Sequence, residues 1–469
     1  MSSLALDFQR PIDSQFGAVR SLRILHIHTD SLGGGAAGIA RSLVQEYRAR
    51  GHVSWMAVGT KQGDDPDVLL IPPVGRWHRY WDAVLGAWRL GRPFQWLAKP
   101  AVQLDRWRGV DGNLFRYPGS RSVLTLAPAR PDIVHCHNLH GWYFDLRMLS
   151  RLSQELPVFV TVHDQWLLTG HCAYTLGCER WKTGCGSCPD LTIYPAIEKD
   201  MTADSWRRKQ TIYAKSRLYL ATPSQWLMDQ VRQSMLACGV VESRVIHNGI
   251  DLSVFRPGDM QTERRALGLP HKVKVLLFVA HDVRRNSFKD FDTVRTAAGL
   301  VADRLREKIL LIGLGDQESA EHVGQAEIRT VPFRDDRNSV ARYYRAADVY
   351  VHAAKNDNFP NTILEALACG RPVVATAVDG IPEQVRSLGM SEDPTGALVP
   401  KGDAHAMACF LGRLLSDDSL RHRLGKNAAK DARQRFDLRR QADAYLEWYN
   451  EIVAGTQAAF RPHTTACPQ

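Results

Sequence analysis

Short apolar runs alternate with longer amphipathic stretches over most of the chain. The runs that we interpret as strands lie at 23–29, 53–59, 132–138, 157–164, 218–224, 274–280, 309–315, 328–333, 349–354 and 372–378. Many are unbroken series of Val, Ile and Leu, which is typical of parallel strands covered by helices on both faces. The alternation therefore predicts an α/β protein with two doubly wound, Rossmann-like domains.

The division between the domains is expected where the series of strands pauses. Residues 245–259 contain the Asn-Gly and Arg-Pro-Gly punctuation of a linker. Near the end of the chain, residues 441–454 carry an apolar stripe at helical spacing. The expected segments are a tail at 1–21, an N-terminal domain at 22–243, a C-terminal domain at 244–430, a helix returning to the first domain at 431–455 and a tail at 456–469.

Composition narrows the class of protein. The 469 residues exceed the ~250–300 that one hydrophobic core supports, and 44% hydrophobic content excludes a mainly disordered or fibrous chain. A net charge of +10 favours anionic partners, but no nucleic-acid-binding motif is visible, so we expect no nucleic acid. The first twenty residues lack an apolar signal region, and no run reaches the ~18 apolar residues of a membrane span. These features predict a cytoplasmic protein.

A glycine-rich turn follows the first predicted strand. Gly33, Gly34 and Gly35 precede a helical stretch, and small residues there let a phosphate-bearing ligand approach the backbone. The spacing differs from the dinucleotide-binding fingerprint G-x-G-x-x-G. An ordinary tight turn between strand and helix is therefore the alternative interpretation.

The most informative stretch of the second half contains two acids eight residues apart, Asp357 and Glu365. A helix is expected to begin near Asn361 and Thr362, residue types that suit a helix cap. Amides at such a helix start suit a diphosphate. A carboxylate one turn further along can accept two hydrogen bonds from a ribose diol. The alternative is that both acids are solvated side chains.

Four of the nine cysteines fall within seventeen residues, at Cys172, Cys178, Cys185 and Cys188. Their spacing, which ends in Cys-x2-Cys, is compatible with a tetrahedral zinc knuckle of purely structural role. The alternative is a group of reduced thiols packed in an insertion at 165–200. Because the insertion follows a predicted strand end, we expect it to shape the acceptor pocket.

Residues 76–108 combine five Trp and seven basic residues with two acids. Aromatic and basic residues on one helix suit the interface of an anionic membrane. The alternative is a helix that packs on its own domain with its arginines in solvent. The stretch is interpreted as a surface for peripheral docking at the inner face of the plasma membrane.

Taken together, the ordered motifs resemble the retaining GT-B glycosyltransferases of the family-four type, also called glycosyl transferases group 1. The run from Asp357 through Glu365-Ala-Leu-Ala-Cys-Gly-Arg-Pro-Val-Val-Ala carries most of the resemblance. Other matching segments are 33–35, 161–163, 223–224, 246–257, 289–290, 379–383 and 396–399. The resemblance implies two Rossmann-like domains facing across a cleft, with a C-terminal helix that crosses back.

The resemblance also implies a hexosyltransferase that uses a nucleotide-diphosphate sugar and needs no cofactor for catalysis. The implied catalytic residues are His163 near the anomeric carbon, Lys289 at the departing phosphate, Asp357 at the sugar hydroxyls and Glu365 at the ribose. The implied donor-binding residues are Gly33, Gly34, Gly35, Arg284, Arg285, Asn358, Phe359, Asn361, Thr362 and Glu365.

The chemistry fits these roles. Breaking a glycosyl–phosphate bond builds negative charge on the diphosphate and positive charge on the sugar, which a fixed lysine, helix-terminal amides and carboxylates stabilise. Three departures from the family pattern affect the assignment. Asp357 stands where Glu is frequent, Pro360 replaces a frequent Gly, and Ala280-His281 replaces Gly-Arg. A contact between arginine and phosphate must then come from 284–285 or be missing.

Three functions remain open at this stage. The leading hypothesis is transfer to a lipid-linked oligosaccharide or other glycan acceptor in exopolysaccharide or lipopolysaccharide biosynthesis. The second is a soluble transferase that makes a small glycoside or a storage sugar. The third is a non-catalytic binding protein with the same fold, which the presence of Lys289 and Glu365 disfavours.

Overall fold

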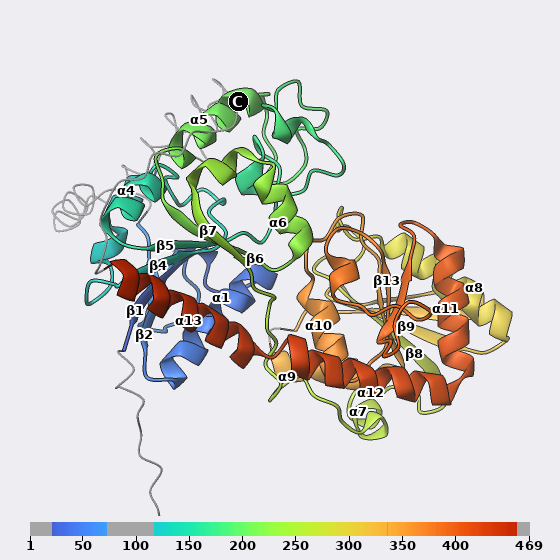
Figure 1. The fold of residues 1–469 in the computed structure, drawn as a ribbon. Helices are drawn as coiled ribbons and strands as arrows, with labels where there is room; N and C mark the ends of the chain where they lie inside the picture. The colour runs from blue at the N-terminus through green and yellow to red at the C-terminus, as the bar shows by residue number, and fades with distance from the viewer. Residues whose placement is uncertain (1–20, 73–116, 335, 457–469) are drawn as a thin grey trace, which may run out of the picture.

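The computed structural model describes residues 21–72, 117–334 and 336–456, which form two α/β domains (Figure 1). The Trp-rich stretch at 76–108 lies outside these residues, so the membrane-docking hypothesis stays a prediction. No helix within the described ranges combines the length and the hydropathy that crossing a bilayer requires.

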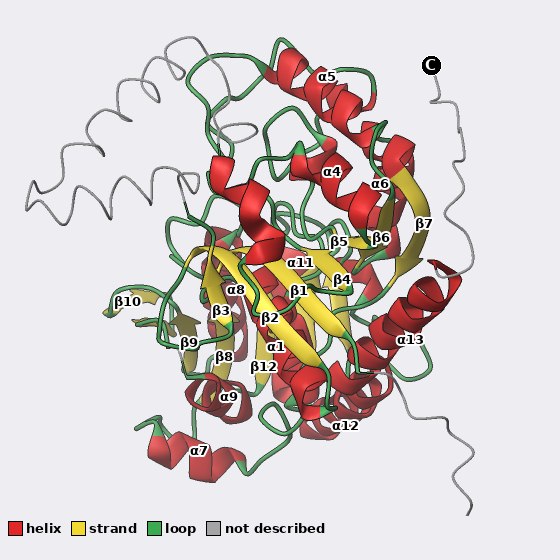
Figure 2. Ribbon diagram, turned by 90° about the vertical axis from the view of Figure 1, so that its left-hand side faces the viewer, coloured by secondary structure: helices red, strands yellow, loops and turns green. Residues whose placement is uncertain are grey.

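The first domain contains a seven-stranded parallel sheet in the order β3-β2-β1-β4-β5-β6-β7 (Figure 2). Its strands are β1 (Arg23–Asp30), β2 (Val53–Thr60), β3 (Val68–Leu70), β4 (Ile133–Cys136), β5 (Val158–Thr161), β6 (Leu218–Thr222) and β7 (Val240–Val245). Its α-helices are α1 (Gly35–Ala49), α4 (Met148–Glu155), α5 (Thr202–Tyr213) and α6 (Gln225–Arg232). Its 3₁₀ turns are η1 (Pro118–Thr125), η2 (Trp166–Leu168), η3 (Arg180–Lys182) and η4 (Met235–Gly239).

The second domain contains another seven-stranded sheet, in the order β10-β11-β9-β8-β12-β13-β14, with only β10 antiparallel. Its strands are β8 (Lys274–Val279), β9 (Ile309–Leu314), β10 (Ser319–Val323), β11 (Ala326–Val331), β12 (Val349–His352), β13 (Val373–Thr376) and β14 (Gly396–Val399). Its helices are α7 (Met260–Ala266), α8 (Phe291–Leu305), α9 (Arg337–Ala346), α10 (Asn361–Ala368), η5 (Ile381–Glu383), α11 (Ala404–Ser416) and α12 (Asp418–Arg435).

The predicted fold class is confirmed, and ten strands coincide with the predicted apolar runs. Four strands were missed because their sequences are short or polar. The strand β3 has three residues, β14 has four, and the edge strands β7 and β10 carry charged side chains in VVESRV and SAEHV. An edge strand exposes one side to solvent and needs no continuous apolar run.

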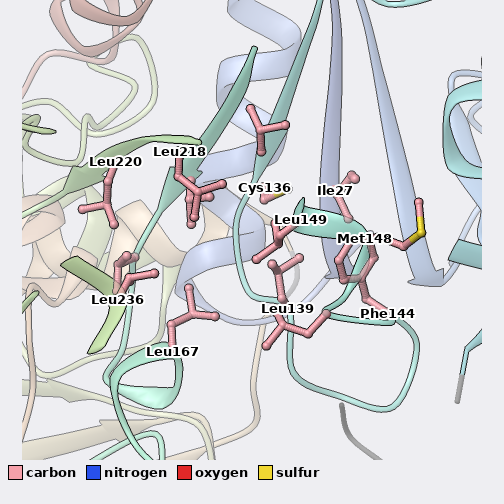
Figure 3. Packing of buried hydrophobic residues seen from close by; sticks show 14 of the residues in the cluster. Ile27, Cys136, Leu139, Phe144, Met148, Leu149, Leu167, Leu218, Leu220 and Leu236 are labelled. Carbon is pink, nitrogen blue, oxygen red and sulfur yellow. The ribbon is translucent and has the colours of Figure 1, made fainter. Parts of the chain in front are cut away.

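Fully buried apolar side chains join sheet and helices in each domain. In the first domain, Ile27 of β1, Cys136 of β4 and Leu218 of β6 pack in one cluster with Leu149 of α4 (Figure 3). Burying such a side chain contributes roughly 1.5–3 kcal/mol. The sheets are therefore rigid supports for the loops at their carboxyl ends.

The chain crosses between the domains twice, and the two crossings are hydrogen bonded to each other. Ile250 donates its amide to Phe436 O at 2.7 Å and accepts from Leu438 N at 3.1 Å. A Cβ atom on Gly249 would lie 2.5 Å from Leu438 Cα, so only glycine allows this approach. The junction is thus two chain segments hydrogen bonded to each other rather than a loose linker.

The last helix, α13 (Leu438–Thr456), leaves the second domain and lies against the first (Figure 1). Its buried residues Tyr445, Trp448 and Tyr449 pack against Ile24 of β1 and Phe159 of β5. The helix that was expected to cross back to the first domain is therefore confirmed.

Candidate active site between the two domains

A cavity of about 340 Å³ lies between the domains, where loops at the carboxyl ends of strands from both sheets meet. From the first domain it is lined by Gly35, Ala36, Asn138, His163, Asp164, Tyr174, Pro223 and Asn248. From the second it is lined by 279–281, Asn286, 288–289 and 356–362. Ligands of doubly wound domains bind at such strand ends, so this cavity is the candidate site.

Lys289 lies at the centre of a group of three ionisable side chains beside the cavity. Its ammonium is ion paired with Asp357 and lies 3.2 Å from Nε2 of His352, whose Nε2 is 3.3 Å from Oδ2 of Asp357. Burial opposes ionisation of Asp357, but Lys289 and His352 outweigh it and lower its pKa to about 2. Burial and the neighbouring lysine lower the pKa of His352 to about 4. At neutral pH the group is one ammonium, one carboxylate and one neutral imidazole.

Backbone contacts hold this group in place. Lys289 forms an isolated bridge with Ala354, and the flanking amide of Lys355 donates to Phe288 O at 2.8 Å. The amide of Asp357 donates to Oδ2 of Asp379 at 2.7 Å. The lysine loop and the acid loop are therefore fixed to each other before any ligand binds.

The start of α10 faces the cavity and contacts the first domain. Asn361 donates through Nδ2 to Gly35 O at 3.0 Å and accepts from Nδ2 of Asn248 at 3.0 Å. Asn358 donates to His163 O at 3.1 Å and accepts from Ser224 Oγ at 2.5 Å. These side chains connect the domains across the cleft, beside helix-terminal amides that suit an anion.

Glu365 lies about one turn further along α10 and is absent from the cavity wall. Its Oε2 accepts a hydrogen bond from Tyr344 OH at 2.8 Å. Burial raises the pKa of Glu365 to about 7, although the Tyr344 bond acts in the opposite direction. The ribose role implied by the resemblance therefore requires a ligand that reaches past Thr362 along the helix.

His163 ends a chain of three hydrogen-bonded histidines. Its Nε2 lies 3.0 Å from Nδ1 of His137, whose Nε2 lies 3.1 Å from Nδ1 of His26. Burial lowers the pKa of His163 to about 4, so the ring is neutral at neutral pH. With Nε2 occupied by His137, Nδ1 is the nitrogen left for a ligand in the cavity.

A metal between the buried histidines is disfavoured by their hydrogen bonds. His26, His135 and His137 bring one ring nitrogen each within 4.8 Å of one another. Both nitrogens of His135 are engaged, with Thr161 Oγ1 at 2.7 Å and Tyr449 OH at 2.6 Å. Both nitrogens of His137 are engaged as well. We therefore interpret the trio as a packed hydrogen-bond cluster.

The contact with His137 gives a testable prediction for His163. We expect His137→Leu to lower kcat roughly fivefold to tenfold, the equivalent of one lost hydrogen bond of about 1 kcal/mol. His137→Asn can keep a donor near the position of Nδ1 and should recover part of the loss. Steady-state kinetics and thermal unfolding of both variants check this. Equal kcat values in the two variants would mean that the hydrogen bond does not position His163.

The glycine-rich turn at 33–35 has a backbone conformation that favours glycine. Gly33 and Gly34 adopt φ values of 93° and 73°, in the left-handed region that favours glycine. Only Gly35 lines the cavity, where an added Cβ would come 3.3 Å from Nδ2 of Asn361. Phe359 also lines the cavity, with its ring stacked on His247 at a centroid distance of 5.2 Å.

The structure places the two candidate arginines outside the cleft. Arg284 donates to Glu321 at 3.2 Å and to Ser319 Oγ at 3.1 Å. Arg284 and Arg285 line a neighbouring cavity of about 420 Å³, which shares Lys289 with the cleft. Neither guanidinium lines the cleft cavity, so among the residues that the structure describes Lys289 is the only lysine or arginine on its wall.

Several cavity residues were missed by sequence reasoning. Tyr174, within the Cys-rich insertion, packs against Phe288 of the second domain with the rings tilted by 38° and 4.2 Å between their centroids. Asp164 accepts from His140 at 2.9 Å. The only available signal for Asp164 and His352 was their position at the ends of predicted strands.

Glu383 of the second domain caps a helix of the first. Its carboxylate accepts from the amides of Gln225 and Trp226, both at 2.8 Å, at the start of α6. Arg435 donates to the carbonyl oxygens of Glu383 and Gln384, at 2.8 and 3.0 Å. The observed arrangement of the domains therefore includes a charged cap that joins one domain to the other.

Two family models match the chain and together span most of it. Residues 33–254 match Glycosyltransferase Family 4, and residues 259–431 match Glycosyl transferases group 1. A D-inositol 3-phosphate glycosyltransferase of Mycobacterium marinum is 34% identical over 466 residues, covering 94% of this chain and 88% of the relative. The putative colanic acid biosynthesis glycosyl transferase WcaC of Escherichia coli K12 is 27% identical over 428 residues. The alignment covers 86% of this chain and 95% of the relative.

Solved structures share the arrangement of the two domains. Sucrose-phosphate synthase from Thermosynechococcus elongatus aligns with a TM-score of 0.60 and 19% identity over 93% of this chain and 100% of that one. Anabaena HepE in complex with UDP and glucose aligns with a TM-score of 0.58 and 16% identity. The alignment covers 92% of this chain and 100% of HepE. These likenesses confirm the GT-B fold.

Proposed function

This chain belongs to the group 1 glycosyltransferases of the family-four type, and from that membership we propose that it transfers a sugar from a nucleoside diphosphate sugar with retention of anomeric configuration. The observation that carries the proposal is Lys289 on the wall of the interdomain cavity, beside the start of α10. HepE, a structural neighbour, is described in complex with UDP-glucose, which supports a donor of this class.

In the proposed reaction, the diphosphate lies between Lys289 and the amides of Asn361 and Thr362. The ammonium and the helix-terminal amides stabilise the negative charge that develops as the glycosyl bond breaks. Asp357 and the neutral His352 hold the ammonium in position. The departing phosphate accepts the acceptor's proton, and attack from the same face retains the anomeric configuration.

For the acceptor we favour a lipid-linked oligosaccharide in exopolysaccharide or lipopolysaccharide biosynthesis. The named role of the E. coli relative in colanic acid biosynthesis supports this choice, because the alignment covers 95% of that protein. The net charge of +10 is compatible with an acceptor that carries a diphosphate at an anionic membrane surface.

A small soluble acceptor is the second candidate. It is favoured by the relatives named D-inositol 3-phosphate glycosyltransferases, which include the M. marinum protein with 34% identity. The two candidates differ in the state of the acceptor, which is anchored in a membrane in one case and free in solution in the other.

The deciding experiment is a screen of nucleotide sugars, first for hydrolysis and then for transfer to membrane extracts or to inositol phosphate. We expect one donor to give a product in the membrane fraction, and NMR of its anomeric proton to report the donor's configuration. Inverted configuration would overturn the retaining mechanism. Transfer to inositol phosphate alone would select the soluble acceptor.

The raised pKa of Glu365 predicts a pH-dependent affinity for the donor. A carboxylate accepts hydrogen bonds from a ribose diol better than a carboxylic acid does. With a pKa of about 7, the ionised fraction rises from roughly a tenth at pH 6 to nine tenths at pH 8, so affinity should rise about tenfold. Calorimetric titration of the donor nucleotide checks this, and Glu365→Gln should abolish the dependence.

The same pKa makes a separate prediction for stability. The folded chain holds the Glu365 proton more tightly than the unfolded chain, where the pKa is near its ordinary 4.5. Stability of the ligand-free protein should therefore be lost as pH rises from about 4.5 through 7. Glu365→Gln should raise the Tm at pH 8 and leave it unchanged at pH 4, which thermal scans would test. A lower Tm at pH 8 would contradict the buried acid.

A further inference from the structure

The Cys-rich insertion, residues 165–200, contains a small cavity separate from the interdomain cavity. The insertion connects β5 to α5 in the first domain (Figure 1). Cys172, Cys178, Cys185 and Cys188 are all free thiols, and all four line this one cavity. Its volume of about 20 Å³ is enough for one water-sized particle. The space therefore suits a single ion surrounded by sulfur.

His171 provides an independent sign that the cavity takes a ligand. Its side chain lies on the same cavity wall and is 2% exposed, and its Nε2 has no hydrogen-bond partner. A buried polar nitrogen left in this way costs about 1–3 kcal/mol. A ligand bound between the thiols would give this nitrogen a partner.

A buried cation behind the cysteine loop favours a negatively charged group within the cavity, against the nearby carboxylate of Asp200. Lys209 is fully buried, and its ammonium donates to Trp166 O at 2.6 Å and to Thr169 O at 3.0 Å. Thr169 in turn donates to Cys172 O at 2.6 Å, so the lysine lies close behind the cysteine loop. Four thiolates around one Zn²⁺ carry a net charge of −2, which would offset this buried cation.

One backbone N–H group already points at a sulfur atom of the loop. The amide of Gly170 donates to Cys185 Sγ at 3.3 Å. Cys185 and Ser187 adopt φ values of 53° and 47°, and Gly184 and Gly186 beside them also have positive φ, so the Cys-x2-Cys segment is tightly turned. An N–H donor to sulfur stabilises a thiolate ligand, as outer hydrogen bonds do at metal sites generally.

We propose that this cavity binds one structural zinc ion through the thiolates of Cys172, Cys178, Cys185 and Cys188, with Nε2–H of His171 donating to a ligand sulfur. Within the described residues, only His26, His135 and His137 bring three ligand atoms within 4.8 Å of one another. The four sulfurs therefore rotate inward when the ion binds, and the thiol protons are released to solvent.

Zinc here would shape the cleft through the loop between its ligands. Tyr174, between Cys172 and Cys178, lines the interdomain cavity and packs against Phe288. Ala173 N donates to Tyr194 O at 2.8 Å, which ties the two arms of the insertion together. The ion would thus fix one wall of the cleft without taking part in the reaction. This consequence rests on the proposed transferase function, whereas metal binding itself does not.

The test is the metal content of the purified full-length protein, prepared without chelators and measured by mass spectrometry. We expect about one zinc per chain, as in a closed tetrahedral site. Cys172→Ser and Cys185→Ser should each lose most of it. The matched control is Cys409→Ser, because Cys409 is an exposed free thiol on α11 of the second domain. Wild-type protein without zinc, even after incubation with Zn²⁺, would overturn the proposal.

A second measurement uses the wild-type protein and therefore does not depend on the folding of the cysteine variants. Wild-type protein stripped of metal and loaded with Co²⁺ should show the intense visible bands of a tetrahedral thiolate site. Weak bands typical of six oxygen or nitrogen ligands would refute it. The His171→Ala variant should retain the thiolate spectrum. If this variant lost the spectrum, His171 would be a ligand in place of one cysteine, and the four-thiolate assignment would be wrong. Zinc content and sugar transfer are measured separately. A protein without zinc would contradict this proposal and not the transferase function, and a protein without transferase activity would contradict the transferase function and not zinc binding.

Discussion

Replacing Lys289 with alanine is expected to lower kcat by a factor of about 10² to 10³ while changing KM much less. The size follows from removing one preorganised group that stabilises charge mainly in the transition state. Lys289 is the basic side chain on the wall of the interdomain cavity, and its ammonium is held by Asp357 and His352. Steady-state kinetics with the donor found in the screen would measure the effect.

The matched control for this loss is Lys308→Ala, which removes an equal charge from an exposed position outside the described cavities. It should leave kcat unchanged. If Lys289→Ala instead raised KM alone, the lysine would be a binding group that acts equally on ground state and transition state.

A double variant separates two roles for Asp357. If Asp357 acts by holding the ammonium, Asp357→Ala should cost little in a Lys289→Ala background, because the two changes remove one unit. Additive losses would mean that the carboxylate contacts the sugar independently, as the family resemblance implies. The ion pair between the two side chains favours the first result.

Replacing Gly249 with alanine is expected to destabilise the protein by about 1–3 kcal/mol, the usual cost of forcing extra volume into a packed region. The added Cβ would lie 2.5 Å from Leu438 Cα and 2.9 Å from Leu438 N, which are backbone atoms that cannot rotate away. The two chain crossings would have to separate. Thermal unfolding should show the loss as a Tm lower by several degrees.

The control for Gly249 is Gly412→Ala in α11, where the nearest neighbour of an added Cβ is Val301 Cγ2 at 3.6 Å, an ordinary contact. Alanine is the better helix former, so the Tm should stay the same or rise. A similar loss in both variants would show that the junction is no more sensitive than a helix interior.

The fold was largely predictable from the sequence because its central strands are unbroken apolar runs. The Ile309–Leu314 strand, for example, is buried along its whole length. Edge strands escaped prediction since half of their side chains face solvent. The returning helix was visible because Ala442, Tyr445 and Tyr449 repeat at helical spacing and are all buried.

The site was predictable only where residues are close in sequence. The run from Asn356 to Thr362 lines the cavity as one segment and includes most of the candidate donor residues of the second domain. Partners from distant segments carry no such signal. Asn248 meets Asn361 across 113 positions, and Lys289 meets His352 across 63. Arg284 was a candidate because the resemblance implies an arginine at the phosphate and the usual position lacks one. Its nearby acid Glu321 lies on a strand that the pattern did not reveal.

Glu383 has a consequence for how the two domains part. When they separate, the amides of Gln225 and Trp226 lose the carboxylate that covers them. That loss costs about 1 kcal/mol and leaves the partial positive charge at the start of α6 facing the widened gap. In the arrangement described here the carboxylate thus covers one electropositive helix end, and separated domains would expose that end to an anion.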